Sequence, residues 1–375
     1  MRLAYLSTDP GVPWGGMKGA SVHMAEVVAA LVAEGTEVLV FVAAISPEAP
    51  PPPAGATIQT LPGPGKGAQT AERLRYQPAL ASCLVGRLRR FGAAALYERI
   101  ALHSAAGAAA ARRVGLPHLV ELNAPLLDEA AAYRHLDLPD IADRLERDTL
   151  ASADMVFAVS PPLVDHALAR GGRRVQLLPN AVAVERFRRP QGRSPTRPVA
   201  VFLGSLRPWH GLETLAGAWR LLGAAAPDLL VVGDGPGRSL LEDVGAKVTG
   251  AVPHGRVPTL LSRGDIGVAP YDSDAPRYFS PLKVFEYLAA GLATVAAAIP
   301  GLEGVLRPGC AILVPPGDPR ALADAVSDLA GDAGKRKRLS RNGRALVVAE
   351  HTWRQRARRI LEAAGEVSAG AGARG

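Results

Sequence analysis

Short apolar runs alternate with helix-like segments along most of the chain, and this alternation constrains the fold more than any other feature. Its first instance is complete: a strand at Leu3 to Ser7, a glycine-rich loop, a helical segment at Ser21 to Gly35 and a strand at Glu37 to Ala43. Ser21 is the candidate N-cap of the helical segment, and Gly35 is its C-terminal stop. The second strand is β-branched and nearly continuously apolar, which is typical of a parallel sheet covered on both faces.

The alternation restarts after a polar stretch rich in Pro and Arg, RFRRPQGRSPTRP. Repeated βα units predict a parallel, doubly wound sheet in each half. We therefore expect a Rossmann-like domain at residues 1–185, a linker at 186–198 and a second Rossmann-like domain at 199–350. The basic segment at about 353–368 is predicted to be a helix that packs back on the first domain. The remaining predicted strands are Ala94 to Arg99, His118 to Asn123, Asp154 to Ser160, Val175 to Asn180, Ala200 to Ser205, Asp228 to Gly235, Ala246 to Val252, Asp265 to Tyr271, Ala293 to Ala298 and Ala311 to Pro316.

Composition and charge narrow the classes of ligand. The 375 residues are 48% hydrophobic and carry a net charge of +8, with basic clusters at Arg186 to Arg193 and Lys335 to Arg344. These clusters are interpreted as solvated faces, with a phosphate-bearing ligand or an anionic membrane surface as the alternative. Aromatic residues make up only 5% and do not interleave with the basic runs, so nucleic acid is not expected as a partner.

Two cysteines and the distribution of apolar residues indicate the compartment. Cys83 and Cys310 have neither metal-ligand spacing nor the density of a disulfide framework, which favours a reducing environment. The chain enters a predicted strand within its first residues, and no apolar run approaches the length of a membrane span. The predicted location is cytoplasmic, with peripheral contact to the inner face of the membrane left open.

Two successive domains of this kind are expected to face each other across a deep cleft, where strand ends and helix N-termini bind ligands. The first loop on this edge, GVPWGGMKGAS, follows a strand and opens a helix. Gly15 and Gly16 would let the backbone approach a phosphate or a sugar, and a plain turn is the alternative. The loop lacks G-x-G-x-x-G spacing and the second strand ends without an acidic residue, so NAD is not expected.

Two loops of the second half are candidates for holding a nucleotide diphosphate. In GSLRPWHGLETL, Arg207 and His210 lie where they could meet phosphate oxygens, although each also suits an ordinary surface or helix start. In VVGDGPG and the later VTGAVPHG, the turns around Gly233, Gly235 and Val252 could form a slot for a flat base. Tight turns that merely connect strands are the alternative.

The segment YFSPLKVFEYLAAG, from Tyr278 to Gly291, is predicted to contain a helix with one carboxylate on a mostly apolar face. Ser280 is the expected N-cap. At about 100° per residue, Glu286 falls at the border of the buried face. A buried carboxylate is costly unless something pairs with it. Glu286 therefore either binds a ligand or forms an i, i+3 pair with Lys283.

Taken in order, these motifs resemble those of the retaining glycosyltransferases of family 4, which have the GT-B fold. The resemblance covers nearly the whole chain and rests on PWGGMKGAS…GTEVLVF, LLPNAV, GSLRPWHG, VVGDGPG, SPLKVFEYLAAGLATVAA and the late HTW. It implies an α/β protein of two Rossmann-like domains that holds a nucleotide-diphosphate sugar mostly in its C-terminal domain. It also implies no metal and no further cofactor, because cationic side chains and a helix dipole neutralise the leaving group.

The resemblance assigns roles residue by residue. Glu286 matches the second glutamate of the family's E-x7-E motif, which hydrogen-bonds the nucleotide ribose. Backbone N–H groups around Ser280 and Leu282 would hold the diphosphate. The residues implied to close on the donor or to neutralise the leaving group are Gly15, Gly16, Arg207, His210 and Lys283.

This sequence departs from the family pattern at named positions. Tyr278 stands where the first glutamate of the motif would be. Ser205 and His210 replace the family's Arg and Lys in one loop, with Arg207 as a compensating cation, and Asn123 replaces a His after the fourth strand. These departures bear on the identity of the donor and on activity.

Three functions are compared. The favoured one transfers a hexose-type sugar from a UDP-, GDP- or dTDP-sugar to an acceptor hydroxyl, with the departing phosphate taking the acceptor proton. The second is a degenerate, non-catalytic GT-B protein that binds a sugar nucleotide or partners an active transferase, and the third is a sugar phosphorylase. The acceptor, whether small molecule, glycan or lipid-linked, is expected to be selected by the N-terminal domain around residues Lys66 to Arg75 and Asn123 to His135.

Overall fold

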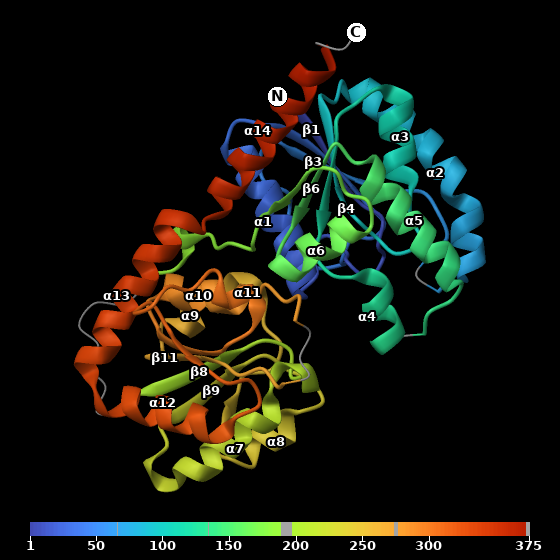
Figure 1. Cartoon of the computed structure of the whole chain (residues 1–375). Coiled ribbons are helices and arrows are strands. Elements are labelled where there is room, and N and C mark those ends of the chain that lie inside the picture. Colours follow the sequence, from blue (N-terminus) through green and yellow to red (C-terminus); the bar gives the residue numbers. More distant parts are fainter. Residues whose placement is uncertain (66, 134, 189–196, 274–276, 373–375) are drawn as a thin grey trace. The chain divides into compact units, whose positions relative to one another are not determined.

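The computed structural model describes residues 1–375 apart from 66, 134, 189–196, 274–276 and 373–375. Contacts divide the chain into two units. Unit 1 comprises Met1–Pro179 and Trp353–Gly375, and unit 2 comprises Asn180–Thr352. Each unit is a parallel β-sheet with helices packed on it (Figure 1).

In the described part of unit 1, seven parallel strands are ordered β3-β2-β1-β4-β5-β6-β7. The chain therefore moves outward from β1 in both directions, as in a doubly wound sheet. The strands are β1 (Arg2–Ser7), β2 (Glu37–Val42), β3 (Ala56–Thr60), β4 (Ala95–Arg99), β5 (His118–Leu122), β6 (Met155–Ala158) and β7 (Val175–Leu177).

Helices cover both faces of this sheet. Ala4 and Leu6 of β1 share a core with α2 and α3, and Tyr5, which alternates with them, faces α1. The last helix, α14, lies beside α1 although the two are far apart in sequence (Figure 1). The helices of unit 1 are α1 (Gly19–Ala33), α2 (Thr70–Phe91), α3 (Ala106–Val114), α4 (Leu126–Tyr133), α5 (Pro139–Ser152), α6 (Pro161–Ala169) and α14 (Trp353–Gly372).

In the described part of unit 2, six parallel strands are ordered β10-β9-β8-β11-β12-β13. One face of the sheet shares a core with α7 and α12, and the other shares a core with α9, α10 and α13. The strands are β8 (Val199–Leu203), β9 (Asp228–Val232), β10 (Lys247–Val248), β11 (Ile266–Ala269), β12 (Ala293–Ala297) and β13 (Ile312–Val314). The helices are α7 (Leu212–Leu222), α8 (Arg238–Glu242), α9 (Val257–Leu261), α10 (Leu282–Ala290), α11 (Pro300–Glu303), α12 (Pro319–Gly331) and α13 (Ala333–Glu350), with 3₁₀ turns η1 (Val184–Arg186), η2 (Pro208–His210), η3 (Gly223–Ala225) and η4 (His254–Arg256).

Several boundaries differ from the sequence predictions. The units divide at Pro179 rather than at residue 185, because Val184 and Phe187 are buried in the core of unit 2. Residues 189–196 of the predicted linker lie outside the described residues. Helix α14 continues to Gly372, beyond the predicted end at 368. Ser21 does not cap α1, since the helix begins at Gly19 with Lys18 as N-cap and Ser21 is buried inside it.

Candidate functional site

The loops after β8 and β9 interlock at the carboxyl edge of the unit 2 sheet. The N–H of Gly204 donates to Val232 O at 3.0 Å, and the N–H of Leu206 donates to Asp234 O at 2.9 Å. The N–H of Gly237 donates to Leu206 O at 3.0 Å. The carboxyl edge of a parallel sheet is where open α/β domains bind ligands, so these bonds shape the candidate site.

Packing accounts for two of the predicted base-slot glycines. A Cβ on Gly233 would lie 2.0 Å from Gly204 O, and one on Gly235 would lie 2.9 Å from Leu206 N. Both residues have positive φ, at 147° and 152°, which other residues rarely adopt. Gly233 also forms a bridge with Gly250, and Val252 packs half-buried against the core. These contacts fit the tight-turn alternative, and the base slot stays a prediction.

Helix α10 starts one residue later than its expected cap would place it. Pro281 is the N-cap, and no side chain caps the helix in the described part of the chain. The predicted capping role of Ser280 is wrong, because its side chain serves another segment. Ser280 Oγ accepts the N–H of Asn180 at 3.1 Å, and Ser280 O accepts Asn180 Nδ2 at 2.6 Å. Ser280 thus ties the start of α10 to the start of unit 2.

Glu286 pairs with a histidine that sequence reasoning did not single out. The side chain of His254, in η4, approaches Glu286 Oε1 through Nε2 at 2.7 Å. Glu286 is 7% exposed. The alternative of an i, i+3 pair with Lys283 is wrong, since Lys283 Nζ makes no hydrogen bond among the described residues. The carboxylate is therefore held at the border of the buried face by the loop after β10.

Lys283 is buried among aromatic rings. It is 8% exposed, and Nζ lies 4.3 Å from the centre of the Phe202 ring and 5.4 Å from that of Tyr271. Burial lowers the pKa of Lys283 to about 7, and the charge of Glu286 opposes this shift. The amine is thus close to half-protonated at neutral pH.

The two loop residues expected to meet a diphosphate have different environments. His210 Nδ1 lies 2.6 Å from Ser205 O, which fixes the neutral ring with its proton on Nδ1. Burial, followed by the charge of Lys283, lowers the pKa of His210 to about 3, so the ring is neutral at pH 7. Arg207 is exposed, and its guanidinium lies 5.9 Å from the centre of the Trp209 ring. Their predicted phosphate contacts remain predictions.

Tyr278 is half-buried and packs edge-on against Phe279, with ring centres 5.2 Å apart. It directly precedes the segment that leads into Leu282, the first residue of α10. An aromatic side chain at this position offers stacking area and a hydroxyl in place of a charge. Ser280, Leu282, Lys283 and Glu286 lie on one short segment, and all of them except Leu282 are buried.

The remaining candidates, Gly15, Gly16 and Asn123, belong to unit 1. A Cβ on Gly15 would lie 2.4 Å from Ala49 Cβ, and one on Gly16 would lie 2.7 Å from Ser21 Oγ. Close packing of the loop after β1 therefore explains both glycines without a ligand. Lys66 and Arg134 of the predicted acceptor regions lie outside the described residues.

Asn123 follows β5 and is oriented by a charged neighbour. Arg99 Nη1 donates to Asn123 Oδ1, and the same atom donates to Glu121 Oε1 at 3.2 Å. With its oxygen held in this way, Asn123 presents Nδ2, which is buried and has no partner in the described part of the chain. The amide is thus positioned as a hydrogen-bond donor.

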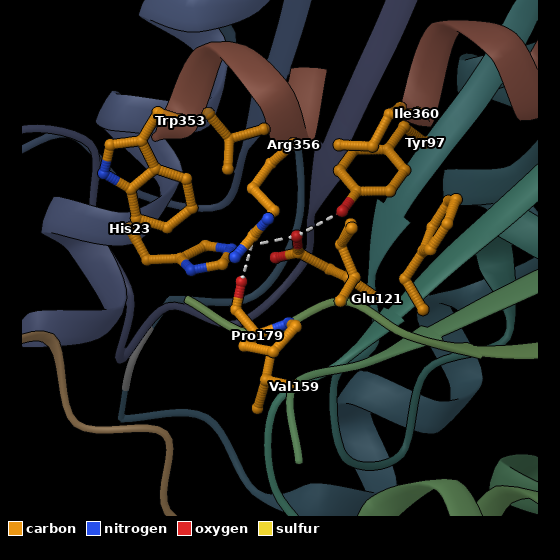
Figure 2. A pocket seen from close by; sticks show the side chains of 11 residues that line it. His23, Tyr97, Glu121, Val159, Pro179, Trp353, Arg356 and Ile360 are labelled. Carbon is orange, nitrogen blue, oxygen red and sulfur yellow. Dashed lines mark hydrogen bonds and ion pairs between the residues drawn. The ribbon is translucent and has the colours of Figure 1, made fainter. Parts of the chain in front are cut away.

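Glu121, two residues before Asn123, is the centre of a buried network that the sequence did not reveal (Figure 2). Glu121 Oε1 accepts from Tyr5 OH at 3.0 Å, and Oε2 accepts from Tyr97 OH at 2.7 Å and contacts His23 Nε2 at 3.0 Å. Burial alone would raise the pKa of Glu121, but His23, then Arg99 and Tyr97, outweigh it and lower the pKa to about 2.

A small cavity lies beside Glu121, and the start of α14 forms part of its wall. Trp353 packs edge-on against His23, with ring centres 5.0 Å apart, and Arg356 donates to Pro179 O at 2.7 Å (Figure 2). The lining side chains are His23, Val27, Tyr97, Glu121, Phe157, Val159, Leu178, Pro179, Trp353, Arg356 and Ile360. This satisfied network fixes β1, β4, β5, α1 and α14 together, which is a structural role.

Two family models match the chain, one in each half. The model described as Glycosyltransferase Family 4 matches residues 17–186, and the model described as Glycosyl transferases group 1 matches residues 197–332. The chain belongs to glycosyltransferase family 4.

Individual curated proteins match only about half of this chain, at less than 30% sequence identity. The teichuronic acid biosynthesis glycosyltransferase TuaC of Bacillus subtilis (strain 168) is 29% identical over 191 residues, which are 48% of this chain and 47% of that protein. The match therefore spans about half the length of this curated relative.

Two solved structures share the fold over nearly the whole chain. Sucrose-phosphate synthase of Thermosynechococcus elongatus gives a TM-score of 0.77 at 21% identity, covering 98% of this chain and 99% of that chain. HepE of Anabaena in complex with UDP gives 0.71 at 17% identity, covering 98% and 100%. The two parallel-sheet α/β domains of this family 4 protein have the GT-B fold.

Proposed function

We propose that this protein is a retaining glycosyltransferase that moves a hexose-type sugar from a nucleotide-diphosphate sugar to an acceptor hydroxyl. One observation carries the proposal. The first turns of α10 bring a buried carboxylate, Glu286, and a buried amine, Lys283, to the carboxyl edge of the unit 2 sheet. A nucleotide-diphosphate sugar offers the matching groups, since its ribose donates hydrogen bonds and its diphosphate carries negative charge.

Each part of the donor has candidate partners in unit 2. Glu286 would accept hydrogen bonds from the ribose hydroxyls, and the N–H groups near Ser280 and Leu282 would face the diphosphate at the start of α10. The base would lie near Gly233, Gly235 and Val252. HepE of Anabaena binds UDP and UDP-glucose, which supports a uridine donor here.

The chemistry follows from retention of configuration. The bond between the anomeric carbon and the diphosphate oxygen breaks while the acceptor oxygen bonds that carbon from the same face. The acceptor proton passes to an oxygen of the departing diphosphate. The role of the protein is to hold the two reactants in register and to stabilise the growing negative charge on the leaving group.

We further propose that this step needs no divalent metal, because the helix N-terminus and the cations beside it can balance the diphosphate. Turnover in excess EDTA, compared with added Mg²⁺ or Mn²⁺, tests the metal independence directly.

The acceptor is proposed to bind on unit 1, with Asn123 Nδ2 as a donor to it or to the transferred sugar. The basic character of the chain would suit a lipid-linked acceptor at a membrane surface as well as a small molecule. None of the helices in the described part of the chain combines the length and apolar character needed to cross a bilayer.

The experiment that tests the donor site is a thermal-shift panel of UDP-, GDP- and dTDP-sugars on the wild type and on Glu286→Ala. A matched donor at 100 times its Kd should stabilise the wild type by about 2.7 kcal/mol. Glu286→Ala should lose most of this shift. Glu242→Ala, which removes an exposed carboxylate paired with Arg238, is the matched control and should keep it. An undiminished shift in Glu286→Ala would refute the site assignment.

The second function, a degenerate protein that binds sugar nucleotides without turnover, is favoured by Tyr278 in place of a family glutamate. Multiple turnovers of donor by the purified protein with an acceptor panel would exclude it. Donor binding without hydrolysis or transfer under any acceptor would support it.

A further inference from the structure

Arg99 joins two polar side chains at the carboxyl edge of the unit 1 sheet. It is the last residue of β4, and only 14% of its side chain is exposed. Its Nη1 donates to Glu121 Oε1 at 3.2 Å and also to Asn123 Oδ1. The carboxyl ends of parallel strands are where open α/β domains bind ligands. Arg99 is therefore in direct contact with one of the candidate site residues.

The chemistry of this contact fixes which way the Asn123 amide faces. A guanidinium carries only hydrogen-bond donors, whereas a side-chain amide has a donor group on one side and an acceptor on the other. Asn123 must turn its carbonyl oxygen to Arg99, because the reverse orientation would place two donors against each other. The NH₂ group is left on the side away from Arg99, and its nitrogen is buried without a partner among the described residues.

Glu121 balances the charge of the arginine. Burial alone would raise the pKa of Glu121, but His23, then Arg99 and Tyr97, lower the pKa to about 2, so the carboxylate is ionised at neutral pH. The hydroxyls of Tyr5 and Tyr97 donate to this carboxylate at 3.0 Å and 2.7 Å and hold it in place. The pair of Arg99 and Glu121 thus fixes the amide without a net charge that would select an anionic ligand.

A second unpartnered polar atom lies on the other side of Arg99. Strand β4 stands between β1 and β5, and Ser7 is in register with Arg99 across β1 and β4. Ser7 is fully buried, and its Oγ has no hydrogen-bond partner in the part of the chain that the structure describes. An unpaired buried polar group costs free energy, which a ligand oxygen at the right place would recover. A hydroxyl and an amide suit uncharged oxygens.

We propose that Arg99 is a positioning residue that holds Asn123 as a hydrogen-bond donor to an uncharged oxygen of a sugar. This inference rests on the proposed function, since it presupposes a sugar-bearing ligand, and it names the group that unit 1 recognises. The oxygen belongs either to the sugar that is transferred or to a sugar of the acceptor. Both offer hydroxyl and ring oxygens that accept a hydrogen bond.

The test measures what the sugar adds to the affinity of a donor. UDP-, GDP- and dTDP-glucose are titrated by calorimetry, and the tightest is compared with its own nucleoside diphosphate. The Kd of the diphosphate divided by the Kd of the sugar nucleotide is the sugar ratio. Arg99→Met removes the guanidinium and lets the Asn123 amide face either way. Arg99→Met and Asn123→Ala should each lower the sugar ratio about fivefold, as expected for one hydrogen bond of about 1 kcal/mol.

Three further variants separate positioning from a merely structural role. The double variant Arg99→Met/Asn123→Ala should give the same sugar ratio as Asn123→Ala, because Arg99 acts through the amide. Arg99→Lys keeps a group that can only donate, so it should restore most of the ratio. Arg2→Met removes an exposed arginine of β1 that pairs with Glu37, and it should leave the ratio unchanged. A structural arginine would lower the melting temperature without changing the ratio.

The release of nucleoside diphosphate distinguishes the two sources of the sugar. It is measured from the same sugar nucleotide without acceptor and with methyl glucoside, galactoside and mannoside. A lower sugar ratio in Arg99→Met assigns the oxygen to the transferred sugar. An unchanged ratio, with acceptor-dependent release slowed alike in Arg99→Met and Asn123→Ala, assigns it to the acceptor.

The failures are also distinct. If the wild type binds a sugar nucleotide but Arg99→Met keeps both the sugar ratio and the release within twofold of the wild type, the inference fails alone. Additive losses in the double variant would also overturn it, because Arg99 would then act independently of Asn123. If the wild type binds none of the three sugar nucleotides, the proposed function fails and this inference falls with it.

Discussion

At the scale of single residues, the burial of the Lys283 amine lowers the stability of the fold. Its amine is desolvated without a hydrogen-bond partner among the described residues, and its pKa falls from 10.5 to about 7. An amine whose pKa is lower in the fold than in the unfolded chain costs stability in full below the folded pKa, and this cost declines as the pH rises toward the unfolded pKa. Functional sites often carry such costs.

Lys283→Met should therefore stabilise the empty protein, and the gain should depend on pH. Below about pH 7 both states of the wild type are protonated, and the gain is largest. Between about pH 7 and pH 10.5 the unfolded wild type is protonated at Lys283 and the folded wild type is not, so the stability of the wild type rises with pH. The gap, which is the difference in free energy of unfolding between Lys283→Met and the wild type, then closes by about 1.4 kcal/mol per pH unit. Urea unfolding from pH 6 to pH 10 measures the gap, with Lys247→Met, which removes an exposed lysine of β10, as a control expected to be flat. A gap that widens with pH would contradict the depressed pKa.

His254 is a positioning residue for Glu286. Its Nε2 lies 2.7 Å from Glu286 Oε1, and no other hydrogen bond to this carboxylate is described. Without His254 the carboxylate would lose this contact and be free to turn away from the proposed ribose site.

His254→Ala should raise KM for the donor about ten- to hundredfold, as for loss of a contact to a charged group of about 1.5–3 kcal/mol. It should also narrow the preference for UDP over 2′-deoxy-UDP, because the ribose contact is loosened. Inhibition constants for the two nucleotides measure this ratio. Arg256→Ala changes an exposed side chain of the same 3₁₀ turn and is the matched control. An unchanged ratio in His254→Ala would show that Glu286 is held without the histidine.

At the scale of elements, the loops after β8 and β9 behave as one structure because their backbones touch. Gly233 permits this contact, since a Cβ there would lie 2.0 Å from Gly204 O at a φ of 147°. Gly233→Ala should cost about 1–3 kcal/mol through backbone strain and should also weaken donor binding, because the loop after β8 borders the site. Gly331→Ala, at the end of α12 with open space around it, is the control and should be neutral or stabilising. Chemical denaturation and donor titration of both variants check the two effects.

Most of the helices and strands could be predicted from the sequence, but fewer of the contacts between side chains could. Buried strands such as β2 read as continuous apolar runs, so the parallel sheets followed from the pattern. Strand β3 was not predicted, because Ala56–Thr60 is a half-buried edge strand of mixed polarity. Glu286 could be chosen from its place on the helix, but its partner His254 is 32 positions away in the sequence.

The same limit explains the errors at the start of α10. Ser280 precedes a helix and fits an N-cap pattern, yet its hydroxyl bonds the N–H of Asn180, which is 100 positions away. Lys283 has the correct spacing for an i, i+3 pair with Glu286, but its amine instead lies over the rings of Phe202 and Tyr271. Local spacing cannot reveal which distant residue competes for a polar group.

At the scale of the whole molecule, the last segment of the chain completes the first unit. Helix α14 packs beside α1, and its Trp353 and Arg356 close the cavity next to Glu121 (Figure 2). Arg354 and Arg358 add ion pairs to Glu34. Helix α14 therefore belongs to unit 1 although it follows unit 2 in the sequence.

Deletion of residues 353–375 should selectively destabilise unit 1. It would expose the buried Glu121 network to water and remove the apolar contacts of Trp353 and Ile360, while the residues of unit 2 keep all their contacts within that unit. In scanning calorimetry we expect one transition of the truncated protein to shift to much lower temperature, and the other to remain and still to rise with the matched nucleoside diphosphate. The double variant Arg354→Ala/Arg358→Ala is the control, because exposed ion pairs are worth about 0–1 kcal/mol each and its melting should change little. If truncation lowered both transitions equally, or abolished nucleotide binding in a unit 2 that is still folded, the assignment of α14 to unit 1 alone would be wrong.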